Sequence, residues 1–378
     1  SKSSLEALND ANFDMMLAQS PSGLLYAGSY RRQKNGTPLV CVNTVHMPSV
    51  YNVVLPDVLN HTPAINQLFE ERVMPMVEAR TTDVYNTGDA LVCLSPGLKK
   101  YWEGRGVEVP VHVIPRAIEK RIFDQTGQDD PFAEDAAPGG RLLVVCRHAR
   151  EKEVDRVIRI FAQYIYPKVE GATLTLVGDG PEHEALKALT KELGVDHRCH
   201  FKGEQGLAQM PAWYHHADLF VYASLSETYG QVISEALWCG LPVVAMDDGM
   251  GVAGQVTDGE DGFLVDPRAE DADSRFGHYA ETLLTKNPLR RQMSEQATRN
   301  AKDRSDPEQC VKRYLEVFEV AKDHAKRHPG GSTVKAYSGL ANWTWLHSLV
   351  GAMGLMRKPV ELNRNQAATG TWTFAPAS

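Results

Sequence analysis

Two carboxylates, Glu227 and Glu235, occupy the segment of this chain with the most chemical content, SLSETYGQVISEALWCGLPVVA. The preceding run, HADLFVYAS, predicts a buried strand that ends near Ser224, and a helix is predicted from Gly230 to about Cys239. The loop between a parallel strand and the next helix is where a doubly wound sheet binds phosphate. Glycine at position 230 lets the backbone approach a ligand closely. We therefore expect Glu227 in this loop and Glu235 in the second turn of the helix, both within reach of one cleft.

A second loop of the same kind carries two cations. In VVCRHAREKEVDRVIRIFA (144–162) a strand ends, a helix begins, and Arg147 and Lys152 flank the turn. Fixed cations beside a helix N-terminus suit a diphosphate. A third strand-to-helix turn, GDGP, begins at Gly178. Each signal alone is common in α/β proteins, so the interpretation depends on their occurrence together.

The elements that position these loops alternate between strands and helices, which predicts an α/β fold with parallel sheets covered by helices on both faces. Four strands are expected in the first part of the chain and six in the second, at 13–20, 37–45, 90–95 and 111–115, and at 141–146, 173–178, 199–203, 219–224, 241–246 and 262–266. Helices are expected between them, at about 22–33, 64–85, 96–106, 152–166, 182–193, 206–215 and 230–239. Because it has fewer strands, the first lobe is expected to be incomplete.

Composition shifts divide the chain into two lobes. The first lobe is expected over 1–122 and the second over 141–305. The stretch 123–140 is acidic, contains Gly and Pro, lacks apolar periodicity and is interpreted as a linker.

The C-terminal part is expected to begin with a helix over 306–328, because Asp306–Pro307 is a favourable cap and first-turn pair. Its apolar face is expected to hold Val311, Tyr314, Leu315 and Phe318. The tail at 329–378 is of uncertain structure and contains a near-helical apolar pattern at 340–356. That pattern favours capping of a lobe over contact with a membrane surface.

The bulk composition excludes several classes of protein. A chain of 378 residues with 43% hydrophobic and 23% charged residues is typical of a soluble globular protein of two domains. The net charge of -8 argues against a general nucleic-acid binder. Six scattered cysteines without a CxxC pair, and no signal-peptide pattern, favour a reduced, cytoplasmic protein. No apolar run approaches the roughly 18 residues of a membrane span, and the initial Ser indicates a fragment or a processed chain.

The order of the motifs resembles the C-terminal lobe of retaining GT-B glycosyltransferases, and more narrowly their family 4 of nucleotide-sugar-dependent enzymes. The motifs are the basic turn at 147–152, VGDGPE, FKG, ADLFVYAS, ETYG, GLPVVA and DGEDGFLV, with Glu227 and Glu235 as the Glu-x7-Glu signature. The resemblance covers about 140–328, and more loosely about 12–122. It implies two Rossmann-like, doubly wound lobes with a cleft between them, and a first lobe that lacks its initial strand–helix units.

The resemblance also implies roles for charged residues. Arg147 and Lys152 are similar to the pair that neutralises the donor diphosphate. Glu235 resembles the carboxylate that holds the ribose hydroxyls, and Glu227 resembles the one that contacts the donor sugar. His46, in NTVHMP, resembles the histidine that faces the donor sugar from the other lobe. Glu227, His46, Arg147 and Lys152 are thus the catalytic candidates.

Backbone groups complete the implied donor site. By resemblance, the segment Thr228, Tyr229 and Gly230 would present N–H groups to the phosphates, and the loop at Gly203 and Glu204 would lie beneath the base. Gly178 joins this donor-binding set. Three positions depart from the family pattern: Cys146 replaces a common Gly, Gly254 stands near a common Glu, and Arg116 occupies a common Asn-Gly site.

Glycosyl transfer separates a cationic sugar from a departing diphosphate, so fixed cations and helix N–H groups should give the largest stabilisation. With Arg147 and Lys152 in that role, neither a metal nor a cofactor is required beyond the co-substrate, a UDP- or GDP-linked sugar. Retention of configuration follows from the resemblance alone. The acceptor is a lipid, a glycan or a small molecule. HMPSVY (46–51) faintly resembles relatives that glycosylate membrane lipids, which favours a lipid and a peripheral membrane contact.

Other interpretations remain open. The carboxylates are also explained as solvated charges near a helix start, Lys152 as the surface end of a helix, and His46 as a structural histidine. A metal at His197, Cys199 and His200 is disfavoured, because side chains alternate along a strand and zinc requires four ligands. The competing functions are a non-catalytic nucleotide-sugar-binding fragment or scaffold and, less favoured, a glycoside hydrolase with paired carboxylates.

Overall fold

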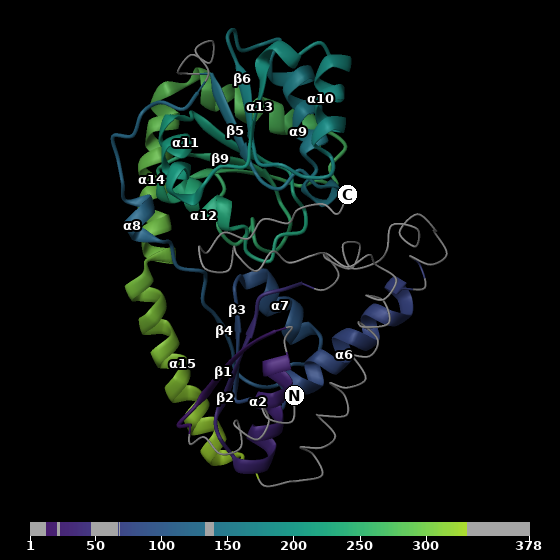
Figure 1. Cartoon of the computed structure of the whole chain (residues 1–378), viewed down its shortest axis with the longest axis vertical. Coiled ribbons are helices and arrows are strands. Elements are labelled where there is room, and N and C mark those ends of the chain that lie inside the picture. The colour runs from purple at the N-terminus through teal and green to yellow at the C-terminus, as the bar shows by residue number, and fades with distance from the viewer. Residues whose placement is uncertain (1–12, 21–22, 47–66, 68, 133–139, 331–378) are drawn as a thin grey trace, which may run out of the picture.

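The chain folds into two lobes, each built on a parallel sheet, as the computed structural model shows for residues 13–20, 23–46, 67, 69–132 and 140–330 (Figure 1). Ten strands lie in these residues, and all ten coincide within a few residues with those expected from the sequence. The apolar runs were sufficient to locate them because strands buried on both faces are almost continuously hydrophobic.

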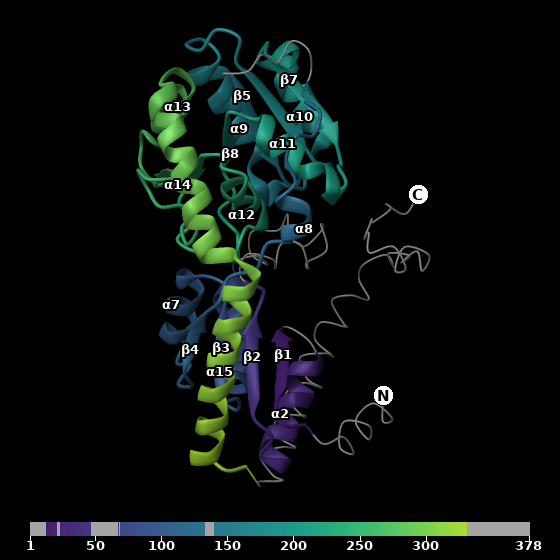
Figure 2. The ribbon, with the colours of Figure 1, turned by 90° about the vertical axis from the view of Figure 1, so that its left-hand side faces the viewer.

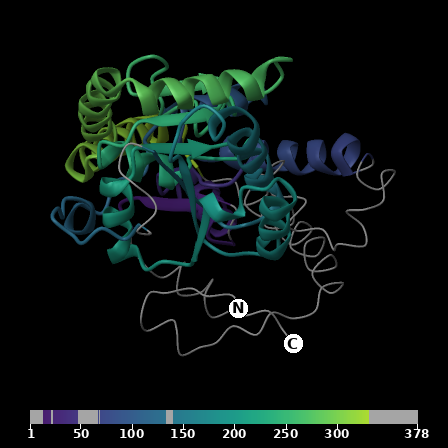
Figure 3. The ribbon, with the colours of Figure 1, turned by 90° about the horizontal axis from the view of Figure 1, so that it is seen from above.

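The first lobe contains a four-stranded parallel sheet in the order β1-β2-β3-β4. Its elements are β1 (Met16–Ser20), α2 (Gly23–Asn35), β2 (Leu39–Asn43), η1 (Phe69–Val73), α6 (Met74–Tyr85), β3 (Ala90–Cys93), α7 (Pro96–Gly104) and β4 (Val111–Val113). Alternate residues of β2 face opposite layers: Leu39 and Cys41 pack toward α2 and α7, whereas Val40 and Val42 pack toward the C-terminal helix. Seen from above, α6 extends beyond the outline of the second lobe (Figure 3).

The second lobe contains a six-stranded parallel sheet in the order β10-β9-β8-β5-β6-β7. Its strands are β5 (Arg141–Val145), β6 (Thr173–Val177), β7 (Cys199–Gly203), β8 (Leu219–Tyr222), β9 (Val243–Met246) and β10 (Gly262–Val265). Its helices and helical turns are η2 (Arg150–Lys152), α9 (Val154–Ile160), η3 (Phe161–Ile165), α10 (His183–Glu192), η4 (Asp196–Arg198), η5 (Leu207–Gln209), α11 (Met210–His216), α12 (Gln231–Trp238), α13 (Ala272–Thr285) and α14 (Asn287–Ser305).

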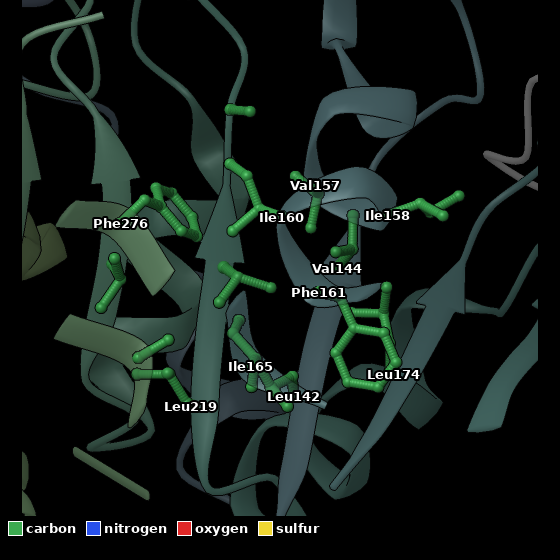
Figure 4. Close-up of a cluster of buried hydrophobic side chains, with 14 of the residues drawn as sticks. Leu142, Val144, Val157, Ile158, Ile160, Phe161, Ile165, Leu174, Leu219 and Phe276 are labelled. Atoms are coloured by element: carbon green, nitrogen blue, oxygen red, sulfur yellow. The ribbon is translucent and has the colours of Figure 1, made fainter. Parts of the chain in front are cut away.

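Helices cover both faces of this second sheet. Leu142 and Val144 of β5 pack against Val157 and Phe161 and against Phe276 of α13 (Figure 4). The alternate residues of β5, at 143 and 145, belong to the core layer on the opposite face of the sheet, together with α11, α12 and α14. The alternation along β5 therefore places one core on each side of the sheet.

The chain reverses its winding direction between β5 and β8, which are adjacent in the sheet. From β5 the strands continue to β6 and β7 on one side, and from β8 they continue to β9 and β10 on the other. In open parallel sheets the crevice at such a switch point, at the carboxyl ends of the strands, is the usual ligand site. The loops after β5 and β8 are the two that carry the cations and the carboxylates.

The predicted helix over 152–166 was wrong in its start. Lys152 lies in the 3₁₀ turn η2, and Glu153 follows with a left-handed φ of 48° before α9 begins at Val154. A left-handed residue breaks the helical path. Lys152 is therefore part of the loop.

The C-terminal helix α15 (Pro307–Arg327) joins the two lobes, running from the second lobe along the sheet of the first (Figure 2). Asp306 caps it by accepting hydrogen bonds from the N–H groups of Glu308 at 2.9 Å and Gln309 at 3.2 Å. The expected start of this helix is thus confirmed.

The apolar residues expected on one face of α15 are not all buried. Val311 and Leu315 are 59% and 57% exposed, whereas the buried side chains are Cys310, Val317, Ala321 and Ala325. Tyr314 and Phe318 are partly buried against the first sheet. The small residues face the sheet because they allow the helix to approach it closely, a packing preference that hydrophobicity alone does not indicate.

The stretch interpreted as a linker begins in α8 (Lys120–Phe123) and packs on the second lobe: Phe123 and Phe132 are buried in its core. The near-helical pattern at 340–356 and most of HMPSVY lie outside the described residues. None of the helices in the described part of the chain combines the length and apolarity that crossing a membrane requires.

Candidate functional site

The loops after β5 and β8 meet through an ion pair. Lys152 Nζ donates a hydrogen bond to Glu227 Oε1. The hydroxyls of Tyr222 and Ser224 donate to the same oxygen at 2.6 Å and 3.0 Å. A cation and a carboxylate that are 75 positions apart in the sequence are thereby fixed at the switch point of the sheet.

Glu227 is held in its ionised form. Burial alone would raise the pKa of this carboxyl, but the Lys152 ammonium and the hydroxyls of Tyr222 and Ser224 outweigh burial, and the pKa lies below its ordinary value. The side chain retains 13% of its exposure, so it is not fully closed off from solvent. An ionised, partly accessible carboxylate is suited to accept hydrogen bonds from hydroxyl groups.

Glu235 lies in the second turn of α12 and has a different electrostatic environment. It is 7% exposed, and the Tyr214 hydroxyl donates to its Oε2 at 2.8 Å. Burial raises the pKa of Glu235 to about 7, and the Tyr214 hydrogen bond offsets only part of this shift. The two carboxylates therefore differ in charge near neutral pH, which is typical of groups with different tasks.

The N-terminus of α12 is shaped by the residues between the carboxylates. Gly230 caps the helix with φ 76°, a conformation that favours glycine. Tyr229 is buried, and its hydroxyl contacts Ser234 Oγ at 3.0 Å and Ser305 Oγ at 2.9 Å. Thr228 is partly buried beside it. Thr228 is thus the residue of this segment that remains partly exposed, whereas Tyr229 and Gly230 are buried.

A second loop, at 248–255, packs against this segment and holds it by hydrogen bonds. The Gly251 N–H donates to the Glu227 carbonyl at 3.0 Å, and the Gln255 side chain donates to the carbonyls of Tyr229 and Gly230. A Cβ at position 251 would lie 2.6 Å from the Glu227 carbonyl oxygen. Asp248 accepts hydrogen bonds from four successive N–H groups, at positions 250–253, and so fixes the supporting loop itself.

The GDGP turn lies beside the β5 loop. A Cβ on Gly178 would come within 1.9 Å of the Cys146 carbonyl oxygen, so glycine is required at 178. Close packing of these two turns thus depends on Gly178 and is compatible with cysteine at 146. Gly178 N–H also donates to the Gly203 carbonyl at 2.8 Å, and the exposed Glu204 follows. The structure therefore joins the basic turn, Gly178 and the Gly203 loop along one edge of the sheet.

Arg147 is the most exposed of the four catalytic candidates. Its side chain retains 54% of its exposure, and its Nη2 lies 4.0 Å from Glu151 Oε1. At that distance the pair is weak. The guanidinium is therefore available to a ligand at the surface beside the β5 loop.

His46 lies in the first lobe, beyond the carboxyl end of β2. It is 8% exposed, and its ring packs edge-on against Tyr101 with centroids 4.6 Å apart. Burial and the nearby Arg105 lower the pKa of His46 to about 4, so the imidazole is neutral. Packing against Tyr101 in the first lobe also explains its position, and the assignment to the donor sugar stays a prediction.

A cleft of about 620 Å³ opens between the lobes. It is lined by Gln19 and Thr44 of the first lobe, by Glu235 and Gln231 of α12, and by Arg116 of the connecting segment. Leu207, which is 51% exposed, and Val311 of α15 add apolar surface. Glu235 thus faces a space that both lobes share.

Sequence reasoning missed the residues that orient the carboxylates. Tyr222, Ser224 and Tyr214 supply the hydroxyls, and Gln255 and Asp248 shape the loop. A polar residue at the end of an otherwise apolar strand was the available signal for Tyr222 and Ser224. Tyr214 and Gln255 act across long sequence separations, for which the pattern gave no signal.

Within the described residues, one group of side chains could hold a metal ion, His148, Asp179 and His183. The residues His197, Cys199 and His200 do not form a metal site. His197 lies in η4 beside Tyr166. Cys199 and His200 are successive residues of β7, so their side chains point to opposite faces of the sheet.

Residues 132–300 match the family model described as glycosyl transferases group 1. The D-inositol 3-phosphate glycosyltransferase of Thermomonospora curvata is 30% identical over 311 residues, which cover 78% of this chain and 69% of that protein. The N-acetyl-alpha-D-glucosaminyl L-malate synthase of Bacillus anthracis is 31% identical over 179 residues, 47% of this chain and 44% of that one.

This chain spans only part of some relatives: 44% of the malate synthase and 24% of the GtfA subunit of a UDP-N-acetylglucosamine–peptide N-acetylglucosaminyltransferase from Streptococcus gordonii.

Solved structures share the fold. HepE of Anabaena, crystallised with UDP, aligns with a TM-score of 0.65 at 19% identity, over 84% of this chain and 81% of HepE. Sucrose-phosphate synthase from Thermosynechococcus elongatus aligns with a TM-score of 0.61 at 18% identity, over 84% of this chain and 76% of that one. Two parallel-sheet lobes, a switch-point crevice and a long alignment with a glycosyltransferase agree: the chain belongs to the glycosyl transferases group 1 family and has the GT-B fold.

Proposed function

We propose that this chain transfers a hexosyl group from a nucleoside-diphosphate sugar to an acceptor hydroxyl, with retention of configuration and without a metal cofactor, as a member of family 4. The observation that carries the proposal is the Lys152–Glu227 pair at the switch point, with Glu235 on the helix that follows. Cations, helix N–H groups and carboxylates at one crevice match the three parts of such a donor: diphosphate, ribose and sugar.

The diphosphate would be bound by cations and backbone donors. Lys152 and the exposed Arg147 supply positive charge, and the backbone of Thr228, Tyr229 and Gly230 opens α12 toward the same crevice. These groups are fixed before the reaction, so they stabilise the charge on the departing diphosphate without reorganisation.

The nucleoside and the sugar would be bound by carboxylate oxygens and by the loops beside them. Glu235 would accept hydrogen bonds from the ribose hydroxyls, and Gly178 with the Gly203–Glu204 loop would lie near the base. Glu227, kept ionised by Lys152, would accept from hydroxyls of the donor sugar, and His46 would approach that sugar from the first lobe.

In the transfer step, the bond between the anomeric carbon and the diphosphate oxygen breaks and a bond to the acceptor oxygen forms. The bonding electrons leave with the diphosphate, and the proton of the acceptor hydroxyl passes to an oxygen of that departing diphosphate. Charge separation is greatest while the first bond is long, which is when Lys152 and Arg147 would contribute most. We assign no covalent nucleophile.

The relatives guide the choice of donor and acceptor. HepE was crystallised with UDP and with UDP-glucose, so UDP-sugars are the first donors to test, with GDP-sugars beside them. The acceptors in the relatives' names differ, from malate to a peptide to an inositol phosphate. A lipid acceptor with peripheral membrane contact is proposed first, on the faint resemblance of HMPSVY (46–51) alone. All six cysteines are free thiols, which fits the cytoplasmic location that we propose.

A two-part experiment tests this function. Thermal stabilisation by UDP- and GDP-sugars is measured on the chain, on Lys152→Ala and on Lys191→Ala, a change at an exposed position of α10. Release of nucleoside diphosphate is then measured with and without lipid, glycan and polyol acceptors. We expect stabilisation by one nucleotide class, weakened in Lys152→Ala alone, and diphosphate release that depends on an acceptor.

The alternatives give different outcomes. A non-catalytic nucleotide-sugar-binding fragment would be stabilised but would release no diphosphate with any acceptor. A glycoside hydrolase would cleave glycosides without a nucleotide requirement. If no nucleotide sugar shifted the melting temperature, the transferase proposal would fail.

A further inference from the structure

Three side chains capable of binding a metal ion converge beside the basic turn, outside the carboxylate pair. His148 follows β5, Asp179 follows β6, and His183 is the first residue of α10. The two Nδ1 atoms of the imidazoles lie 2.9 Å apart, and His183 Nδ1 lies 3.4 Å from Asp179 Oδ1. One ligand atom from each side chain falls within 4.8 Å of the others.

The backbone holds this group rigidly. The His148 N–H donates to the Asp179 carbonyl at 2.9 Å, and the Glu182 N–H donates to the His148 carbonyl at 3.0 Å. A Cβ on Gly180 would lie 2.4 Å from the His148 carbonyl oxygen, so the two loops could not be this close with a larger residue. The ligand atoms are therefore brought together by the course of the main chain.

The two imidazoles do not use all of their hydrogen-bonding capacity. Both Nδ1 lone-pair positions point into the same small space, and only one N–H can lie between them. His148 is 0% exposed, and its Nε2 has no hydrogen-bond partner. A cation between the rings would use both lone pairs.

We infer that His148, Asp179 and His183 bind a divalent transition metal ion, best matched by Zn²⁺, through the two Nδ1 atoms and one carboxylate oxygen. Imidazole nitrogen with a carboxylate suits zinc and its neighbours, whereas Mg²⁺ and Ca²⁺ prefer oxygen ligands alone.

Two of the three distances between ligand atoms can be compared with those around such an ion. Ligands about 2.1 Å from a tetrahedral zinc lie about 3.4 Å from each other. The His183–Asp179 separation of 3.4 Å already has that value, and the imidazole separation of 2.9 Å must widen by only a side-chain rotation. The fourth position is left for water, since Asp179 is on the exposed side of the group.

The ion would link two loops that carry donor-site residues. His148 is adjacent to Arg147 and close in sequence to Lys152, whereas Asp179 follows Gly178. Occupancy would therefore fasten the basic turn to the GDGP turn. This is a structural role, distinct from the metal-independent transfer proposed above. A failure of the transfer proposal would not contradict metal binding, and a failure of metal binding would not contradict the transfer proposal. The α10 N-terminus disfavours a cation, so we expect moderate affinity.

The test is zinc binding by the full chain, purified without a histidine tag and treated with chelator. Equilibrium dialysis against ZnCl₂ gives the stoichiometry and affinity, and Co²⁺ substitution gives an absorption spectrum that reports tetrahedral coordination. We expect one ion per chain, a rise in melting temperature with zinc, and at least about a tenfold loss of affinity in His183→Ala and in Asp179→Asn.

The controls separate loss of a ligand from loss of folding. His278→Ala removes an exposed histidine on α13 and should bind zinc as the unchanged chain does. Asp179 is exposed, and asparagine retains an oxygen that accepts the Gly180 N–H, so Asp179→Asn should fold normally. Equal zinc affinity in the unchanged chain, His183→Ala and Asp179→Asn would overturn the inference, as would failure of the unchanged chain to bind zinc or Co²⁺.

Discussion

The ammonium of Lys152 and the carboxylate of Glu227 form an ion pair across the junction of β5 and β8, the point where the second sheet reverses its winding. The side chains retain 20% and 13% of their exposure, so the pair is largely shielded from solvent. Shielding strengthens the mutual attraction of the two charges, and for Glu227 this attraction and the hydrogen bonds from hydroxyl groups outweigh the cost of burial. A diphosphate beside Lys152 and a sugar beside Glu227 would therefore meet charges that are already in place.

Replacing Lys152 with Ala should slow sugar transfer more than it weakens donor binding. Loss of one preorganised donor to the developing charge costs about 2.7–4 kcal/mol in the barrier, or about 100- to 1,000-fold in kcat. Steady-state kinetics with the preferred donor provide the measurement.

The matched control is Lys191→Ala, which removes a lysine from an exposed position of α10. Its kcat should equal that of the unchanged chain. If Lys152→Ala retained full kcat, Lys152 would have no part in stabilising the leaving group.

Nucleotide affinity should depend on pH through Glu235. Its pKa of about 7 lies above the ordinary value for glutamate, so the carboxyl is protonated at lower pH and ionised at higher pH. The ionised form accepts hydrogen bonds from ribose hydroxyls more strongly. Affinity should thus rise as the pH increases through 7 and fall about tenfold for each unit below it. Calorimetric titration with the nucleoside diphosphate across this range measures the effect.

Two variants isolate the contribution of this carboxyl. Glu235→Gln cannot ionise, so its affinity should be low and should lack this part of the pH dependence. Tyr214→Phe removes the hydrogen bond that lowers the pKa of Glu235, so the midpoint should move to higher pH. An identical pH profile in Glu235→Gln and the unchanged chain would disprove the role of this residue.

The sequence was sufficient to predict the ten strands and the loops that carry the candidate residues, because buried parallel strands are nearly continuous apolar runs. Glu227 could be placed at the end of a strand for the same reason, and Glu235 in the second turn of the helix that follows. The left-handed Glu153, which keeps Lys152 out of α9, was not predicted, since a non-glycine residue in that conformation has no reliable sequence signal.

Contacts between distant segments were also beyond prediction. The hydrogen bonds from Tyr214 to Glu235, from Gln255 to Tyr229 and between His148 and His183 join residues 21, 26 and 35 positions apart. Periodicity describes one element at a time, whereas these pairs depend on how loops from different strands pack. The exposure of Val311 and Leu315 on α15 has the same cause, because the face that meets the first sheet is chosen by packing.

Replacing Gly251 with Ala should displace the Glu227 loop. The added Cβ would lie 2.6 Å from the Glu227 carbonyl oxygen and 2.7 Å from the Tyr229 nitrogen, both backbone atoms that can yield only if the loop moves. We expect kcat to fall by at least about tenfold, because a shift of about 1 Å at a reacting group costs up to about 100-fold.

Gly104→Ala is the control for this change. A Cβ at position 104 meets nothing within 4 Å, and the residue lies at the end of α7 without a left-handed φ. Its activity should be unchanged. Equal kcat in both variants would show that the loop tolerates the added methyl group and that its position does not limit catalysis.

Replacing Asp89 with Ala should destabilise the chain strongly, because Asp89 links α15 to the first lobe. Asp89 is fully buried, pairs with Arg32 at 2.6 Å, and contacts His324 Nδ1 at 3.0 Å near the far end of α15. Its removal would leave the Arg32 guanidinium, whose side chain is 5% exposed, without its counter-charge. Breaking a buried pair on one side costs about 3–5 kcal/mol. Urea denaturation measures the free energy of unfolding.

The control for Asp89 is Asp323→Ala, which breaks an exposed pair with Lys326 on the same helix. The side chains of that pair retain 68% and 76% of their exposure, so its loss should cost no more than about 1 kcal/mol. A loss of similar size in both variants would mean that the buried charges are compensated by water or by neighbouring groups. A large difference instead would show that the buried contacts of Asp89 with Arg32 and His324 contribute far more to stability than the exposed pair on the same helix.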